Sequence, residues 1–143
     1  MSPTYFLATI ALMIVLHFLV PLAVPVPFAW RFVGLFPIAA GVAVNIAADR
    51  QFKRHGTTVK PLQKSSALIT DGVFKWSRNP MYLGMVLIVA GIALLEGSIS
   101  PWFVVAALAI VLDRVFIARE EALLKETFGD AFEHYCRRMR RWV

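Results

Sequence analysis

The sequence has few charged residues and almost no cysteine. Asp, Glu, Lys and Arg together make up 17% of its 143 residues, whereas soluble domains carry about a quarter. The single cysteine, Cys136, excludes an intramolecular disulfide framework and fits a reducing compartment. His17, His55 and His134 are scattered and no C-x-x-C motif occurs, so we predict no metal site. These shortages exclude a disulfide-rich secreted domain and argue against an ordinary soluble one.

What the sequence does have is long apolar runs. Apolar residues make up 59% of the chain, and they gather in four segments, at residues 5–24, 28–48, 81–95 and 102–117. The first is long enough to cross about 30 Å of hydrocarbon. The last two are short and are joined by a turn, so we expect them to form a helical hairpin. The sequence therefore predicts an all-α, polytopic membrane protein with about four transmembrane helices, forming one domain over residues 1–143.

The basic residues predict an orientation in the membrane. All Lys and Arg residues except Arg31 lie within residues 50–78 or from residue 114 onward, and the two hairpin turns carry none. Because cytoplasmic loops carry an excess of Lys and Arg, both basic regions and both termini are predicted to be cytoplasmic. The net charge of +6 then follows from topology. Nucleic-acid binding is the poorer interpretation, because the basic residues flank membrane segments and form no separate domain.

A basic amphipathic helix is predicted after the fourth segment, in the cytoplasm. Apolar residues recur there at steps of three or four, namely Leu124, Phe128, Phe132, Tyr135, Met139 and Trp142. Gly129 is expected to break or bend this helix. Such a helix lies in the headgroup layer, attracted by anionic lipids, or packs on the cytoplasmic face of the protein itself. The sequence leaves both arrangements open.

A polar block precedes the third segment. Asn79 and Pro80 fit the start of a helix, where a missing backbone N–H is harmless. Helix initiation does not explain Arg78 or Tyr82, which lie at the predicted membrane boundary. Because ionisable residues beside membrane segments are costly, we expect these two side chains to serve function.

A second polar block, Glu120 and Glu121, follows the fourth segment. Adjacent helical residues point about 100° apart, so one can face inward, although a solvated helical turn is the ordinary explanation. The hairpin brings this pair to the level of Arg78, where acidic, basic and aromatic groups make a pocket the size of a zwitterion. Gly84 and Gly91 share one face of the third segment. That face serves close helix packing or leaves a bare surface for a flat ligand.

Four motifs, in order, resemble those of a known family of membrane enzymes. They occupy residues 68–74, 77–84, 120–124 and 128–135. The sequence resembles the integral-membrane isoprenylcysteine carboxyl methyltransferase and phospholipid methyltransferase families over about its C-terminal half. The residues from Arg78 to Tyr82 are similar to the Arg-His/Asn-Pro-x-Tyr signature, and Glu120-Glu121 to the paired glutamates. Asn79 stands where the eukaryotic carboxyl methyltransferases have histidine, a departure that bears on the prenylcysteine substrate and not on methyl transfer.

The resemblance implies a methyltransferase that uses S-adenosylmethionine, bound on the cytoplasmic face among the last helices. The acceptor is then a lipophilic small molecule or lipid that arrives from the bilayer, here the bacterial inner membrane. The implied catalytic residues are Arg78, Tyr82 and Glu120. The implied cofactor-binding residues are Asn79, Pro80, Tyr82, Gly91, Glu120 and Glu121. Whether oxygen, nitrogen or sulfur receives the methyl group stays open.

Two other classes of protein also stay open. One is a nicotinamide-dependent membrane enzyme similar to the steroid reductases, and the other is a small non-enzymatic membrane protein whose polar blocks only fix topology. For a methyltransferase, in-line transfer needs no covalent enzyme intermediate, so alignment of donor and acceptor supplies much of the rate. We expect the apolar tail of the acceptor to remain in lipid beside the second segment and the amphipathic tail helix.

Overall fold

A computed structural model describes residues 3–56 and 67–143 of the chain. Within these ranges all regular secondary structure is helical, which confirms the predicted all-α class. The elements in chain order are α1 (Pro3–Leu19), α2 (Phe28–Arg31), η1 (Phe32–Gly34), α3 (Leu35–Arg54), η2 (Gly72–Lys75), α4 (Pro80–Glu96), α5 (Ser100–Val111), η3 (Leu112–Ile117), α6 (Ala118–Phe128) and α7 (Asp130–Arg138). Two residues used in the topology prediction, Lys60 and Lys64, lie outside the described ranges.

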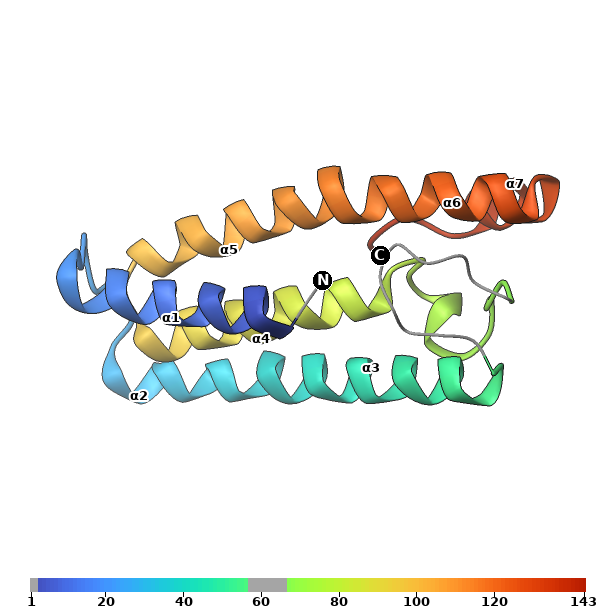
Figure 1. Ribbon diagram of the computed structural model, residues 1–143. Helices are drawn as coiled ribbons and strands as arrows, with labels where there is room; N and C mark the ends of the chain where they lie inside the picture. Colours follow the sequence, from blue (N-terminus) through green and yellow to red (C-terminus); the bar gives the residue numbers. More distant parts are fainter. Residues whose placement is uncertain (1–2, 57–66) are drawn as a thin grey trace.

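The long helices run side by side as an antiparallel bundle (Figure 1). Two continuous rods, Phe28–Arg54 and Ser100–Phe128, are long and apolar enough to cross a membrane, while α1 and α4 are shorter apolar helices. Both rods extend beyond the predicted segments at their polar ends, and α1 ends at Leu19, earlier than predicted. The early end is explained by Pro21 and Pro25, which cannot donate to a helical ladder.

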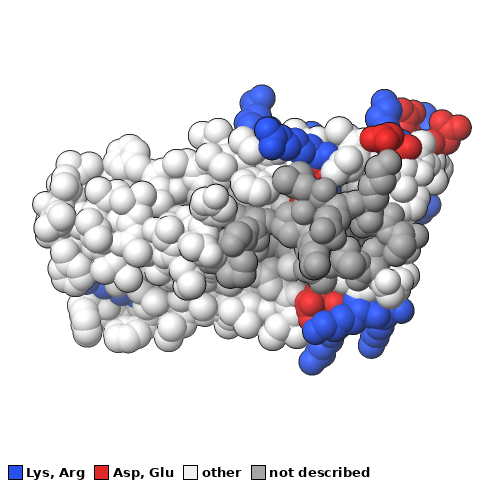
Figure 2. Space-filling model, in the orientation of Figure 1, with Lys and Arg blue, Asp and Glu red and all other residues white. Residues whose placement is uncertain are grey.

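The two hairpin turns meet at one end of the bundle, here called the turn end (residues 20–27 and 97–99). The backbone N–H of Ile99 donates to the carbonyl of Ala23 at 3.0 Å. The ring Nδ1 of His17 and the hydroxyl of Ser98 share a hydrogen bond of 2.7 Å. The opposite end, where α3 ends, α4 begins and α6 and α7 lie, is here called the polar end. Most visible charged side chains gather there (Figure 2).

Glycines allow the rod that contains η1 and α3 to pack backbone to backbone on α4. A Cβ atom on Gly91 would lie 2.4 Å from the carbonyl oxygen of Gly34, and one on Gly34 would lie 2.3 Å from that of Gly91. Gly41 and Gly84 face each other in the same way, at 2.5 and 2.8 Å. Small residues at such positions are typical of membrane helix interfaces, where close approach provides the attraction. The face shared by Gly84 and Gly91 is therefore covered by the preceding rod.

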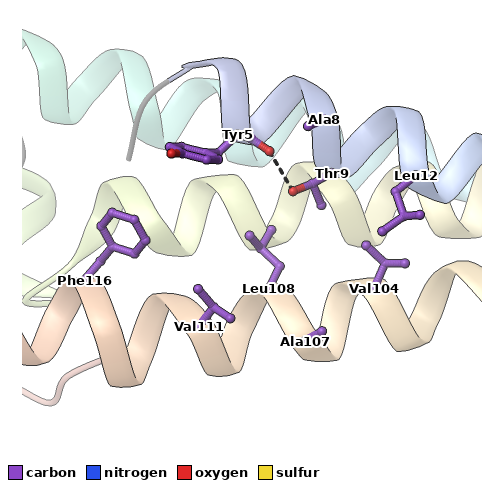
Figure 3. A pocket seen from close by; sticks show the side chains of 9 residues that line it. All are labelled: Tyr5, Ala8, Thr9, Leu12, Val104, Ala107, Leu108, Val111 and Phe116. Carbon is purple, nitrogen blue, oxygen red and sulfur yellow. Dashed lines mark hydrogen bonds between the residues drawn. The ribbon is translucent and has the colours of Figure 1, made fainter.

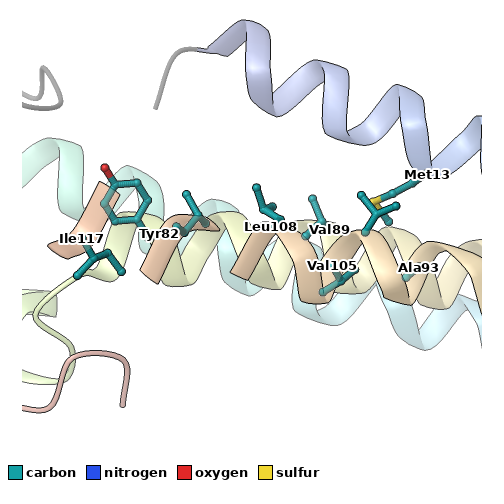
Figure 4. Packing of buried hydrophobic residues seen from close by; sticks show 9 residues of the cluster. Met13, Tyr82, Val89, Ala93, Val105, Leu108 and Ile117 are labelled. Atoms are coloured by element: carbon teal, nitrogen blue, oxygen red, sulfur yellow. The ribbon is translucent and has the colours of Figure 1, made fainter. Parts of the chain in front are cut away.

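The core lies between α1, α4 and α5, and large apolar residues also cover the outside. Met13, Val89 and Ile117 are fully buried within the core cluster (Figure 4). On the outer surface Phe36 is 81% exposed and Phe18 75%. Soluble monomers rarely expose apolar surface on this scale, whereas lipid-facing helices require it. The buried and exposed apolar residues together fit a helical membrane protein.

The tail after α6 folds back on the protein. Gly129 breaks the helix with a φ of +50°, as predicted, and α7 follows. Phe132 and Tyr135 are buried, and the Tyr135 hydroxyl donates to the carbonyl of Phe74 at 2.6 Å. Burial also raises the pKa of Tyr135 to about 12. These buried contacts place α7 against the protein's own surface, the second of the two arrangements left open.

The predicted apolar stripe is wrong at its last two positions. Helix α7 ends at Arg138, so Met139 and Trp142 belong to a non-helical stretch, residues 139–143, here called the C-terminal segment. The sequence period continues through these positions, but the chain leaves the helix to run back over the polar end (Figure 1).

Candidate functional site

The turn before α4 is bonded to the C-terminal segment. Pro80 is buried in the first turn of α4, where its missing N–H leaves no bond unmade. The backbone N–H of Arg78 donates to the carbonyl of Arg140 at 3.1 Å, and Asn79 Nδ2 donates to the carbonyl of Arg141 at 3.2 Å. Asn79 holds the N-cap position, yet its side chain makes no capping bond. Its amide instead holds the C-terminal segment in place.

Tyr82 and Glu120 meet across the hairpin, as the sequence predicts. The Tyr82 hydroxyl donates to Glu120 Oε1 at 2.6 Å, a short distance typical of a charge-assisted hydrogen bond. The Tyr82 side chain is buried, and its ring contacts that of Phe116 with the centroids 6.3 Å apart. A phenol and a carboxylate joined in this way can bind a polar group of a ligand or accept a proton from it.

Glu121 lies between two guanidinium groups. Arg78 Nη2 lies 3.3 Å from Glu121 Oε1. Arg141 approaches with two nitrogens, Nη2 at 2.6 Å from Oε2 and Nε at 3.3 Å from Oε1. The side chains of Arg78 and Glu121 are only 14% and 15% exposed. Paired and bidentate contacts of this kind satisfy a buried carboxylate whose isolated burial would be costly.

Asp113 and Trp142 extend the hydrogen-bond network around Arg141. Asp113 Oδ1 accepts from Arg141 Nη1 at 3.3 Å and from the indole Nε1 of Trp142 at 3.0 Å. Asp113 lies in η3, a π-helical stretch within the otherwise α-helical rod, and such stretches often occur at functional sites. The sequence prediction missed both residues and Arg141. A carboxylate inside the fourth apolar segment was the available signal for Asp113.

The Arg78 guanidinium also contacts α7. Its Nη1 donates to the sulfur of Cys136 in α7. Its Nε is buried and has no hydrogen-bond partner among the described residues. A buried guanidinium N–H without a partner is a donor that a bound ligand can satisfy.

These side chains form one group, here called the polar cluster. Its members are Arg78, Tyr82, Asp113, Glu120, Glu121 and Arg141. Hydrogen bonds to Glu121 and Asp113 raise the pKa of Arg141 above its usual value. By formal charge, the cluster holds three carboxylates against two guanidinium groups and is net negative. It therefore favours a ligand whose positive groups outnumber its negative ones.

Gly91 is the predicted site residue that the structure does not bring to the polar cluster. It lies nine residues after Tyr82 in α4, on the order of 13 Å along the helix axis at 1.5 Å per residue. The space in which a side chain at position 91 would lie is occupied by Gly34 and Ile38. In this structure Gly91 serves the packing of α3 on α4.

The fold and the cluster define the class of protein. The chain is a small all-helical membrane protein with a single group of convergent acidic, basic and aromatic side chains among its described residues, at one end of the bundle. The chain belongs to the phospholipid methyltransferase family, whose sequence model matches residues 29–131. The match includes the turn before α4 and both glutamates, and it confirms the family resemblance seen in the motifs.

Two curated proteins are similar to parts of the chain. An uncharacterized protein from Haemophilus influenzae is 36% identical over 63 residues, which are 44% of this chain and the full length of that protein. The protein-S-isoprenylcysteine O-methyltransferase of Schizosaccharomyces pombe is 37% identical over 76 residues. Those residues are half of this chain and 30% of the yeast enzyme. No solved structure matches the chain significantly.

Proposed function

We propose that the protein transfers a methyl group from S-adenosylmethionine to a lipophilic acceptor at the cytoplasmic face of the membrane. The observation that carries this proposal is the polar cluster, in which Tyr82 binds Glu120 at 2.6 Å beside a glutamate held between two arginines. Membership of a methyltransferase family gives the reaction class. The cluster gives the place where donor and acceptor would be aligned.

The residues present fit S-adenosylmethionine by charge. Its sulfonium and ammonium groups outnumber its one carboxylate, which complements the net negative charge of the cluster. The Nε of Arg78, which has no hydrogen-bond partner in the described part of the chain, is a donor for the carboxylate. Glu120 and Glu121 are acceptors for the ammonium group or the ribose hydroxyls. When bound, the cofactor supplies the reactive methyl carbon.

The protein side chains would act mainly by positioning. Because Glu121 is held by Arg78 of the turn before α4 and by Arg141 of the C-terminal segment, its orientation is fixed before any ligand arrives. Such preorganisation can provide much of the rate of an in-line transfer. An amine acceptor must also lose a proton, and Glu120 with its bound Tyr82 hydroxyl is the group placed to take it. A carboxylate or thiolate acceptor releases no proton and needs only the alignment.

The proposed location follows from the charge distribution along the bundle. The polar end carries the basic residues of α3, α6 and α7, while the turn end carries none in its two turns. The positive-inside rule assigns the polar end to the cytoplasm. The protein would then sit in a bacterial inner membrane with both termini and the cofactor site on the cytoplasmic side.

Calorimetric titration of the purified protein in detergent tests the cofactor. S-adenosylmethionine should bind and NADPH should not, which separates the proposal from a nicotinamide-dependent enzyme. Glu121→Ala should weaken S-adenosylmethionine binding about tenfold or more, because a lost charge-assisted contact costs about 1.5–3 kcal/mol. Glu126→Ala, at an exposed glutamate of the same helix, is the matched control and should bind as the wild type does. Binding of neither cofactor would favour a non-enzymatic membrane protein.

A further inference from the structure

An apolar groove runs between α1 and α5 (Figure 3). It has a volume of about 450 Å³, within the range of ligand pockets. Of the nine residues that line it, Tyr5 and Thr9 alone carry a polar side-chain group. The Thr9 hydroxyl already donates to the carbonyl of Tyr5 at 2.8 Å. The groove therefore offers a ligand almost only hydrocarbon contacts.

One end of the groove reaches the polar cluster. Phe116 lines that end, opposite Tyr5 (Figure 3). The Phe116 ring contacts the ring of Tyr82 at a centroid distance of 6.3 Å, and the Tyr82 hydroxyl binds Glu120. The apolar surface of the groove thus continues through two aromatic rings to the carboxylate proposed to face the acceptor.

The groove is long, and its outer wall faces the exterior of the bundle. From Phe116 to Val104 it extends on the order of 18 Å along the rod, at 1.5 Å per residue. On its inner side Val104 and Leu108 are buried, whereas Tyr5 and Leu12 of α1 are 65% and 49% exposed. A chain lying in the bilayer can enter it sideways with no need to pass through water.

We propose that this groove holds the hydrocarbon chain of the methyl acceptor, with its polar head at Tyr82 and Glu120. The inference rests on the proposed methyl transfer and adds where the chain lies and which helix selects it. The selecting wall is α1, which precedes the residues matched by the family, 29–131. The sequence had favoured the second segment and the tail helix for this role, but Phe132 and Tyr135 of the tail helix are buried in the protein.

The groove recognises a chain by fit. A lipid chain is already out of water before it binds, so entry gains packing contacts and no transfer from water. Chains that match the groove in length gain the most contacts, and carbons beyond its end gain none. Selectivity should therefore rise with chain length and then level off.

Photo-cross-linking tests occupancy of the groove. The probe is a lysophosphatidylethanolamine with a diazirine midway along its single chain, incorporated in liposomes with the full-length protein. Ala107 lines the groove, while its neighbour Ala106 is exposed and does not. Ala107→Phe should lower cross-linking to α1 and α5 by about tenfold, and Ala106→Phe should leave it unchanged. Equal labelling of both variants, or labelling spread evenly over all helices, overturns the proposal.

A second pair of variants tests whether a loss of labelling comes from the filled groove or from a misfolded protein. Ala8 lines the groove from α1, and the exposed Ala11 on the same helix does not. Ala8→Phe should repeat the effect of Ala107→Phe, and Ala11→Phe should repeat that of Ala106→Phe. Loss of labelling in only one groove variant, with thermal unfolding of both like the wild type, rejects the groove as the site.

Methyl transfer separates this inference from the proposed function. With labelled S-adenosylmethionine, Ala107→Phe should lower transfer to a long-chain S-alkyl cysteine or phosphatidylethanolamine more than it lowers transfer to the short-chain counterpart. An equal fall with long and short chains rejects the groove and leaves methyl transfer standing. Groove-specific cross-linking without S-adenosylmethionine binding or transfer to any acceptor rejects the methyltransferase proposal and leaves a hydrocarbon-binding groove.

Discussion

Arg141 joins the C-terminal segment to the polar cluster, and its removal gives a quantitative test of the site. Arg141→Ala deletes the guanidinium that contacts Glu121 at 2.6 Å and Asp113 at 3.3 Å. Arg140→Ala is the matched control, because the Arg140 side chain is exposed and the turn before α4 uses only its carbonyl. The comparison isolates the ion pairs from a general loss of positive charge.

The expected size follows from the contacts. A hydrogen bond to a charged group contributes about 1.5–3 kcal/mol. The Arg141 side chain is 36% exposed, so solvent screening places the effect at the lower end of that range. We expect Arg141→Ala to lower the free energy of unfolding by about 1.5–2 kcal/mol. Because Glu121 then loses one of its two ion-pair partners, the affinity for S-adenosylmethionine should fall about tenfold, the factor that corresponds to 1.4 kcal/mol.

Unfolding of the protein in mixed micelles, followed by circular dichroism, measures the stability term, and calorimetry measures the affinity. A double-mutant cycle with Glu121→Gln should give a coupling energy of about 1.5 kcal/mol between Arg141 and Glu121. A coupling energy below about 0.5 kcal/mol would show that the Arg141–Glu121 pair behaves as an exposed ion pair and contributes little to stability. The reasoning would also be refuted if Arg140→Ala lowered the free energy of unfolding as much as Arg141→Ala does.

Three further outcomes are expected. Tyr82→Phe keeps the ring but removes the bond to Glu120, so methyl transfer should slow about tenfold or more while the S-adenosylmethionine Kd stays within about twofold; an unchanged rate would remove Tyr82 from the reaction. Gly91→Val forces a side chain against the Gly34 carbonyl and should cost about 1–3 kcal/mol of stability, measured by unfolding in micelles. In a background with the native cysteine replaced by serine, Arg50→Cys should resist an impermeant thiol reagent in intact cells, and labelling there would reverse the proposed orientation.

The meeting of the two polar blocks was predictable because it depends on topology. Two apolar segments joined by a short turn must return the chain to the membrane face it left, which brings Arg78 to Glu121 and Tyr82 to Glu120. No side-chain packing is needed for that inference. The turn at Gly129 was predictable for a similar local reason.

Other parts of the site depend on tertiary structure. Arg141 stands among neighbouring arginines with the same sequence signal, and only the end of α7 and the path of the C-terminal segment select it. The apolar pattern stops before the helices do, so the ends of both rods were missed. Gly91 shows a further limit of sequence patterns, because a glycine at a helix interface and one beside a ligand look alike in sequence.

The glycine contacts between α3 and α4 also determine which part of the bundle can move. A slide of one residue would bring Ala90 or Ile92 opposite Gly34 and force the two helix axes apart, so this pair keeps its register. Helix α1 has no glycine and no such contact; it packs through side chains such as Met13, and hydrogen bonds at the turn end, including that of His17, hold its last turn. Any widening of the proposed groove between α1 and α5 would then come from α1 and not from this fixed pair. In hydrogen exchange, the amides of α4 should open last and those near the start of α1 first.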